Sequence, residues 1–277
     1  MKLFRTIALA AVTALGLAAG PPVQAQDTQQ ALAADSVIET IKQRGMLRVG
    51  LSTFVPWAMR DKNGDLIGFE VDVAKKLAED MGVEIEFVPT AWDGIIPALL
   101  AGNFDVIIGG MSITPQRNLT VNFTMPYAHS SVGVMAHIAS TKGLKWPDDY
   151  NSPDITFTCR RGATPCDYIK ANFPKATLRV FDDQNQTVQE VLNGNAQVMM
   201  SSQPLPAFTI YDNPEIVFAP NEEPINPGSE AFVLRKGDPD ALNFFSNWIM
   251  LHTVDGWLEE RHSYWFGGRP WADQVAE

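Results

Sequence analysis

Apolar positions recur along this chain with the two periods expected of strands and helices. The segment 46–52 has the apolar pattern of a strand, and the segment 68–82 predicts an amphipathic helix. Four apolar residues would share the buried face of that helix: Phe69, Val73, Leu77 and Met81. The segment 83–90 alternates apolar residues with Glu84 and Glu86, which indicates a strand with one exposed side.

The alternation of strands and helices continues through the middle of the chain. A helix is predicted over 93–102 and a strand over 104–110. Beyond them we expect a strand, a helix, a strand, a helix and a strand, over 154–159, 164–173, 176–181, 187–194 and 196–202. This order is typical of an α/β protein with mostly parallel sheets, which is the fold class that we predict.

The first 25 residues predict a secretory signal peptide. Lys2 and Arg5 precede an apolar run over 7–19, and small residues lie before the expected cleavage after Ala25. The run is short for a bilayer span, and no cysteine follows it, so we expect a soluble exported protein. Loss of the two basic residues changes the net charge from −11 to −13, which argues against nucleic acid or an anionic membrane surface as a partner.

The remaining length, about 250 residues, is enough for two lobes with sizeable cores. Cys159 and Cys166 are the only cysteines, and an oxidising compartment favours a disulfide between them. Two free, buried thiols are the alternative. Two cysteines and four scattered histidines show no ligand spacing, so we expect neither a metal nor a cofactor.

The segment 109–117, GGMSITPQR, combines a glycine pair, two hydroxyls and an arginine at an expected helix start. Thr114 is the predicted N-cap, Pro115 the first helical residue, and Arg117 lies in the first turn. Helix-start N–H groups favour an anion, and a guanidinium adds a two-pronged grip on a carboxylate. The segment therefore predicts a carboxylate site, with a solvated surface arginine as the alternative.

Five motifs, in order, resemble the family 3 periplasmic solute-binding proteins that serve polar amino acid ABC transporters. The motifs are GFEVDVAKKLAEDMG, WDGIIPALLAGNFDVIIGGMSITPQR, FTMPY, RGAT and VLRKGDP, and the resemblance covers 37–265. It implies the substrate-binding component of an importer, in the periplasm, monomeric and not an enzyme. Its partners would be a small carboxylated solute and the transporter permease.

The resemblance also implies a two-lobed, type II-like periplasmic binding protein fold with two crossover hinge strands. The crossovers are expected near 134–140 and 222–231. Lobe 1 would comprise 37–136 and 230–277, and lobe 2 would comprise 137–229. The ligand would lie between the lobes, which close on it as a hinge.

The ligand contacts implied by the resemblance begin with Arg117, which would bind the carboxylate with support from Gly110 and Ser112. The second-lobe hydroxyl would be Thr164. The sequence independently predicts Thr164 as an N-cap, followed by a proline and by Asp167 in a capping box, so capping alone is an alternative role.

Aromatic walls for the ligand side chain are expected at Phe54 and Trp92. Either residue could instead belong to a core, and Trp57 is the fallback wall. Arg160 lies where some relatives contact the ligand, so an anionic second group on the ligand would suit it.

The sequence departs from the family at Ser202, where amino-acid binders carry an aspartate for the ligand ammonium. Gln197 also replaces a common acidic residue. An unpaired, desolvated ammonium would cost about several kcal/mol, so the simplest inference is a ligand without a free α-amine. Ser52 stands near the position where binders of basic side chains carry an acid, which disfavours arginine, lysine and histidine.

Two alternatives stay open. Glu230 is expected in solvent, as most glutamates are, but it could supply the missing negative charge, and an ordinary amino acid would then fit. The chain could also be a cyclohexadienyl dehydratase-like enzyme on the same fold. Such an enzyme needs a positioned proton donor, and the corresponding position here is Leu205.

Overall fold

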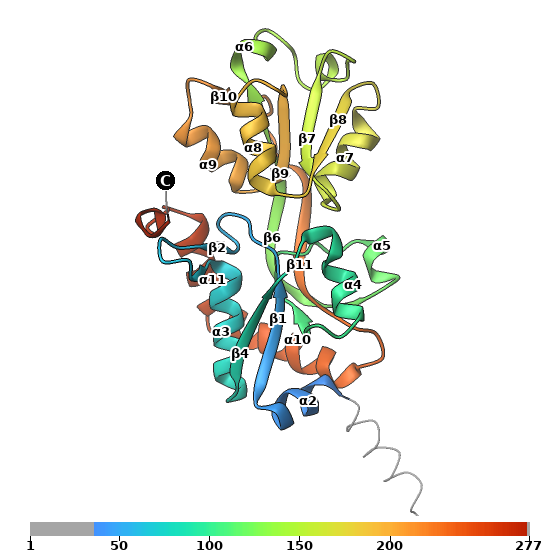
Figure 1. Cartoon of the computed structure of the whole chain (residues 1–277), viewed down its shortest axis with the longest axis vertical. Helices are drawn as coiled ribbons and strands as arrows, with labels where there is room; N and C mark the ends of the chain where they lie inside the picture. The colour runs from blue at the N-terminus through green and yellow to red at the C-terminus, as the bar shows by residue number, and fades with distance from the viewer. Residues whose placement is uncertain (1–35, 276–277) are drawn as a thin grey trace, which may run out of the picture.

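The computed structural model describes residues 36–275, so the predicted signal peptide lies outside the described residues. Two α/β lobes lie one above the other and are joined by the long strands β6 (Asn122–His137) and β11 (Ile225–Leu234) (Figure 1). The lower lobe, lobe 1, combines the N-terminal part with the C-terminal helices, and the upper lobe, lobe 2, holds the middle of the chain.

The elements of lobe 1 are α2 (Val37–Arg44), β1 (Met46–Leu51), β2 (Met59–Arg60), β3 (Leu66–Ile67), α3 (Phe69–Met81), β4 (Glu84–Pro89), η1 (Trp92–Gly94), α4 (Ile95–Leu100), β5 (Val106–Ile107), α5 (Pro115–Asn118), α10 (Pro239–Val254), α11 (Trp257–Phe266) and η3 (Ala272–Gln274). Those of lobe 2 are α6 (Ile138–Thr141), η2 (Asp148–Tyr150), β7 (Thr156–Arg160), α7 (Thr164–Asn172), β8 (Thr177–Phe181), α8 (Gln184–Leu192), β9 (Val198–Ser202), α9 (Leu205–Asp212) and β10 (Val217–Phe218).

One mixed sheet of the described chain runs through both lobes in the order β4-β1-β5-β11-β6-β9-β7-β8, with β10 beside β6. The pairs within each lobe are parallel, β1 with β4 and β5, and β7 with β8 and β9. The antiparallel pairs of this sheet are β6 with β9, β10 and β11, and β11 with β5. The predicted α/β class is confirmed.

The exchange of β6 between partners marks the passage from one lobe to the other. β6 pairs with β11 from Asn122 to Val132, and from Val132 to Ala136 it pairs with β9 of lobe 2. We therefore propose a lobe boundary that precedes Val134, earlier in the chain than the segment 134–140 expected from the sequence.

The amphipathic helix predicted over 68–82 is α3. Phe69, Val73 and Leu77 are fully buried, and they join the largest apolar cluster of lobe 1. In β4 the two glutamates are exposed, as the alternation indicated.

The strand predicted over 104–110 is shorter than expected, because only Val106 and Ile107 form β5. The chain turns out of the sheet at Gly110, whose φ of +64° is a left-handed conformation that favours glycine.

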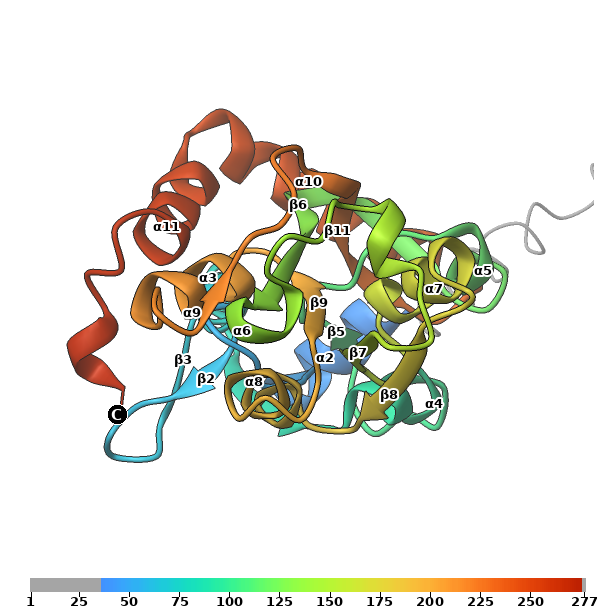
Figure 2. The same cartoon turned by 90° about the horizontal axis from the view of Figure 1, so that it is seen from above.

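The segment after α11 docks on lobe 2. Arg269 forms an ion pair with Asp212 of α9 at 2.6 Å, and its guanidinium lies 5.0 Å from the ring centre of Phe208. Trp271 is buried in the core of lobe 1. This C-terminal segment therefore contacts both lobes, beside α9 as seen from above in Figure 2.

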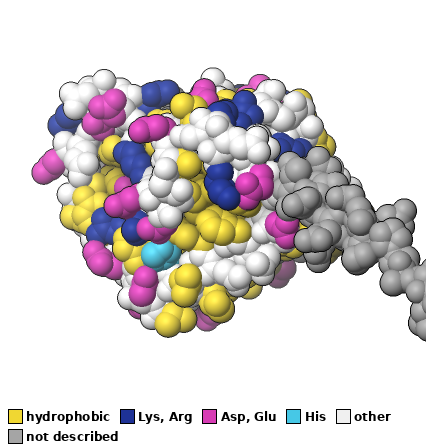
Figure 3. Space-filling view, turned by 90° about the horizontal axis from the view of Figure 1, so that it is seen from below, with side chains coloured by type: hydrophobic (Ala, Val, Ile, Leu, Met, Phe, Trp, Pro, Cys, Tyr) yellow, Lys and Arg dark blue, Asp and Glu magenta, His cyan; other side chains and the backbone are white. Residues whose placement is uncertain are grey.

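The outer face of lobe 1 carries acidic and basic side chains interspersed with apolar ones, without a broad field of one sign (Figure 3). In the part of the chain that the structure describes, we find no helix with the length and apolar character needed to cross a membrane.

Candidate functional site

The predicted helix start after the glycine pair forms as expected. α5 begins at Pro115, and the Thr114 hydroxyl accepts a hydrogen bond from the Arg117 backbone N–H at 3.2 Å. Arg117 Nη1 donates to the Ser112 carbonyl at 2.8 Å, so its guanidinium folds back over this loop. Burial lowers the pKa of Arg117 from its usual value, although the group stays cationic at neutral pH.

Gly110 packs against the core of lobe 1. A Cβ atom on Gly110 would lie 3.0 Å from the ring of Trp57, so larger residues are disfavoured by contact as well as by φ. The Gly110 N–H donates to the Tyr127 hydroxyl at 3.0 Å, which fixes the start of the loop.

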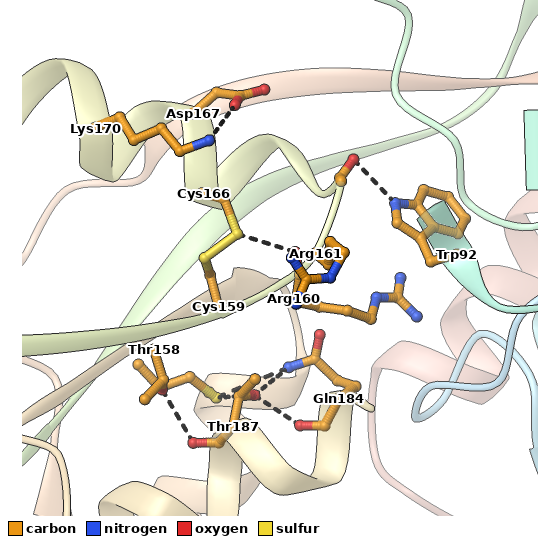
Figure 4. Close-up of a disulfide and its surroundings, with 12 residues drawn as sticks. Trp92, Thr158, Cys159, Arg160, Arg161, Cys166, Asp167, Lys170, Gln184 and Thr187 are labelled. Carbon is orange, nitrogen blue, oxygen red and sulfur yellow. Dashed lines mark hydrogen bonds and ion pairs between the residues drawn. A yellow bond between two sulfur atoms is a disulfide. The ribbon is translucent and has the colours of Figure 1, made fainter. Parts of the chain in front are cut away.

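A loop of lobe 2 over 160–163 faces this loop, and the predicted disulfide closes it. Cys159 and Cys166 are bonded, with Cα atoms 5.5 Å apart (Figure 4). The Gly162 carbonyl accepts hydrogen bonds from Trp92 Nε1 at 3.2 Å and from Arg117 Nη2 at 3.0 Å. The two lobes therefore meet at this carbonyl.

Arg160 extends from this loop between the two expected aromatic walls. Its guanidinium carbon lies 4.9 Å from the ring centre of Phe54 and 4.6 Å from that of Trp92, and Figure 4 shows it pointing toward Trp92. Nη1 lies 3.4 Å from the Ser52 hydroxyl. The structure thus brings Phe54, Trp92 and Arg160 together, with a guanidinium between the rings as in a cation–π contact.

The two guanidinium groups at this interface, half-buried Arg117 and buried Arg160, form no ion pair with a carboxylate of the described chain. Arg160 is 5% exposed, its Nε has no hydrogen-bond partner, and burial lowers its pKa to about 10. Among residues 36–275, no carboxylate oxygen lies within 4.0 Å of Arg117 or Arg160. Asp167 acts on Arg117 and Asp183 on Arg160 only from beyond 4.0 Å, so the two cations from opposite lobes lack a direct counter-charge.

The N-cap prediction at Thr164 is wrong. Ala163 is the extended residue before α7, and its carbonyl accepts the Cys166 N–H at 3.0 Å, so Thr164 is already helical. The predicted capping box is also absent, since Asp167 forms an exposed pair with Lys170 at 3.6 Å.

The structure also places three further positions that the sequence singled out. Ser202 is the last residue of β9 and lies opposite Val132 of β6, near the crossover. Gln197 has a structural contact, because its Oε1 accepts the Thr156 N–H at 2.9 Å. Trp57 is buried behind Phe54, with ring centres 5.7 Å apart, so it supports that wall from the core side.

The expectation that Glu230 lies in solvent is wrong, because the side chain is only 1% exposed. Its Oε1 accepts from the Ser130 hydroxyl at 2.7 Å and from the Ser112 hydroxyl at 3.3 Å, and its Oε2 is buried without a partner. Burial raises the pKa of Glu230 to about 7.

A second buried acid, Glu70, was missed from the sequence. The Tyr127 hydroxyl donates to its Oε1 at 2.5 Å, and the same hydroxyl accepts from the Gly110 N–H, so this acid supports the loop over 109–117. Burial raises the pKa of Glu70 to about 8. The available signal was its position in helical register with buried Ala74 and Leu77.

The protein should lose stability as pH rises from about 5 to 8. Glu70 and Glu230 have native pKa values above their ordinary value of 4.5, so the native state binds more protons than the unfolded state in this window. In the Glu70→Gln variant, the free energy of unfolding should fall less between pH 5.5 and pH 8 than in wild type, by on the order of 2 kcal/mol. Urea unfolding at pH 5.5 and pH 8 measures the effect; equal slopes in variant and wild type would contradict it.

Removal of the disulfide by Cys159→Ser with Cys166→Ser should lower the free energy of unfolding by roughly 2 to 3 kcal/mol, because the loop becomes unrestricted in the unfolded chain. Urea unfolding gives this value, and wild type treated with reductant is the matched control. A variant as stable as oxidised wild type would show that the bridge contributes nothing to stability.

Taken together, a two-lobed α/β fold with charged side chains from both lobes at its crossover defines a class of proteins that enclose a small solute. Residues 47–268 match the bacterial extracellular solute-binding proteins, family 3, and the chain belongs to that family.

Individual relatives match almost the whole chain. The L-cystine-binding protein TcyJ of Escherichia coli (strain K12) is 28% identical over 94% of this chain and 95% of its own. The cyclohexadienyl dehydratase of Pseudomonas aeruginosa is 25% identical over 95% of each chain. A candidate ABC transporter binding component from Wolinella succinogenes, solved in complex with lysine, is 34% identical, covers 83% of this chain and 99% of its own, and has a TM-score of 0.78.

Proposed function

We propose that this chain is the periplasmic substrate-binding component of an ABC importer, and that it captures a small solute with two anionic groups between its lobes. The amino acid-binding relatives support the transport role. The observation that carries the ligand class is the pair of guanidinium groups that face each other across the lobes without an ion-pair partner, half-buried Arg117 from lobe 1 and buried Arg160 from lobe 2.

The first anionic group of the solute would be a carboxylate on Arg117. The carboxylate would accept hydrogen bonds from the guanidinium, and the Thr114-capped start of α5 fixes the loop that carries this side chain. Charge-assisted hydrogen bonds of this kind are about twice as strong as neutral ones. A carboxylate here would also offset the desolvation cost of the Arg117 charge.

The second anionic group would meet Arg160. A buried cation without a partner is unfavourable by several kcal/mol or more, so an anion that arrives with the ligand gains this energy. The Phe54 and Trp92 rings hold the guanidinium in place and limit its motion. The disulfide restricts the loop that carries it.

The same arrangement opposes cationic ligands. The Wolinella succinogenes protein was solved with lysine. In this chain the space between the two rings holds the Arg160 guanidinium, and Ser52 supplies a hydroxyl where an acid would favour a cation. A basic ligand side chain would approach a like charge with no acid to offset it.

Dehydratase chemistry is the second candidate, because the Pseudomonas aeruginosa enzyme aligns with nearly the whole chain. Leu205 packs in an apolar cluster of lobe 2 and offers no proton. Steady-state assays with prephenate test this candidate directly. We expect no turnover above the buffer rate; saturable turnover that is lost in the Arg117→Ala variant would favour the enzyme.

A thermal-shift screen of mature protein freed of bound ligand tests the proposed class. Glutamate, aspartate, glutarate and succinate are compared with glutamine, asparagine, arginine and lysine at one concentration. Binding to the native state raises the melting temperature, so the diacids should give the largest shifts. Larger shifts with lysine or arginine would overturn the assignment of Arg160.

A further inference from the structure

Glu230 occupies a position that joins both crossover strands to the loop over 109–117, which carries Arg117. It lies in β11 opposite Ala128 of β6, and on its other side it forms a bridge with Ser112. The side chain receives two hydroxyls on Oε1, from Ser112 and Ser130, while Oε2 is buried without a partner. One oxygen of this carboxylate therefore has capacity for a donor that the surrounding protein does not provide.

Groups of opposite charge flank Ser112. Arg117 donates to its carbonyl at 2.8 Å, and Glu230 accepts from its hydroxyl at 3.3 Å. The two do not form an ion pair with each other, since no carboxylate of the described chain comes within 4.0 Å of Arg117. An α-amino acid carries its carboxylate and its ammonium on one carbon atom, so its head group could meet both charges at once.

The other acids near the crossover are not available for this role. Glu70 is fully buried behind Gly110, and its Oε1 is taken by the Tyr127 hydroxyl. Position 202, at the end of β9, is a serine, so lobe 2 offers no carboxylate there. Asp93 and Asp167 are exposed and already have cationic partners, Arg161 at 4.0 Å and Lys170 at 3.6 Å.

We propose that Glu230 binds the ammonium group of an α-amino acid whose carboxylate lies on Arg117, so that the ligand is an acidic amino acid rather than an amine-lacking diacid. This inference rests on the proposed function and names the ligand within the proposed class. The charges agree with it, because Arg117, Arg160 and ionised Glu230 sum to one positive charge and an acidic amino acid carries one net negative charge.

The test compares L-glutamate with glutarate, which has the same two carboxylates and no amine. Calorimetric titration of Glu230→Gln should show glutamate affinity reduced about 30-fold or more, because an ammonium loses a charged acceptor, while glutarate affinity stays within about threefold of wild type. Glu230→Asp, which keeps the charge, should retain the preference for glutamate. Glu84→Gln, an exposed acid of β4 outside the crossover strands, is the matched control and should change neither affinity.

The outcomes separate this inference from the proposed function. If wild type binds glutarate as tightly as glutamate or more tightly, the role of Glu230 is overturned and the diacid class stands. If Glu230→Gln weakens both ligands equally while its unfolding midpoint is unchanged, Glu230 supports the loop and does not bind the amine. If wild type binds neither ligand and binds lysine, the proposed function itself fails.

Discussion

The Arg117→Ala variant should bind its carboxylate ligand roughly 100 to 1,000 times more weakly than wild type. Removal of one partner of a buried charge pair costs about 3 to 5 kcal/mol, and each 1.4 kcal/mol is about a tenfold change in affinity. The Arg117 side chain makes hydrogen bonds only to two backbone carbonyls, those of Ser112 and Gly162. Its loss should therefore reduce binding far more than stability. Isothermal titration calorimetry measures the affinity.

Two controls make this result interpretable. Arg117→Lys keeps the charge but loses the two-pronged geometry, so it should fall between alanine and wild type. Arg60→Ala removes an exposed arginine of the same lobe whose hydrogen bond is to Gly64, and it should leave affinity unchanged. Wild-type affinity in a folded Arg117→Ala variant would place the carboxylate site elsewhere.

Replacement of Arg160 by alanine should abolish the preference for a second acidic group. In wild type we expect glutamate to bind at least about 100-fold more tightly than glutamine, because the amide leaves a buried guanidinium without an anion. In the variant the affinities for glutamate and glutamine should differ by no more than about fivefold. The comparison of two ligands on one protein cancels general losses of stability. Competition titration of the two ligands gives the ratio.

The neighbouring Arg161 offers a matched control for this experiment. It is exposed and pairs with Asp182 at 2.6 Å, so Arg161→Ala should preserve the wild-type ratio. The Arg160→Ala variant should also accept uncharged side chains, since the space between Phe54 and Trp92 becomes available. A glutamate preference that persists in this variant would assign the second anion to another group.

Local rules recovered the parts of the site that depend on neighbouring residues. The cap at Thr114 and the helix start at Pro115 follow from side chains within one turn, so the sequence was sufficient. The disulfide likewise joins residues seven apart. At Thr164 the same rule failed, because the chain begins α7 from Ala163 without any side-chain cap.

Long-range packing decided the parts that the sequence did not predict. Glu230 is of a residue type that is usually exposed to solvent. Here β6 on one side and the loop of Ser112 on the other enclose its side chain. The place of Arg160 between two rings depends on lobes that meet through residues about 70 to 110 positions apart, as in the bonds from Trp92 to Gly162 and from Arg160 to Ser52. No local pattern encodes such a contact, whereas the family resemblance already implied the fold that creates it.

The most direct test of the central claim is a calorimetric titration of ligand-free wild type with L-glutamate and, separately, with L-glutamine at pH 7.5. The two ligands differ only in the charge and hydrogen-bonding of the distal group, which we place on Arg160. We predict at least about 100-fold tighter binding of glutamate. Equal affinities, or tighter binding of glutamine, would contradict the claim that two anionic groups define the ligand of this protein.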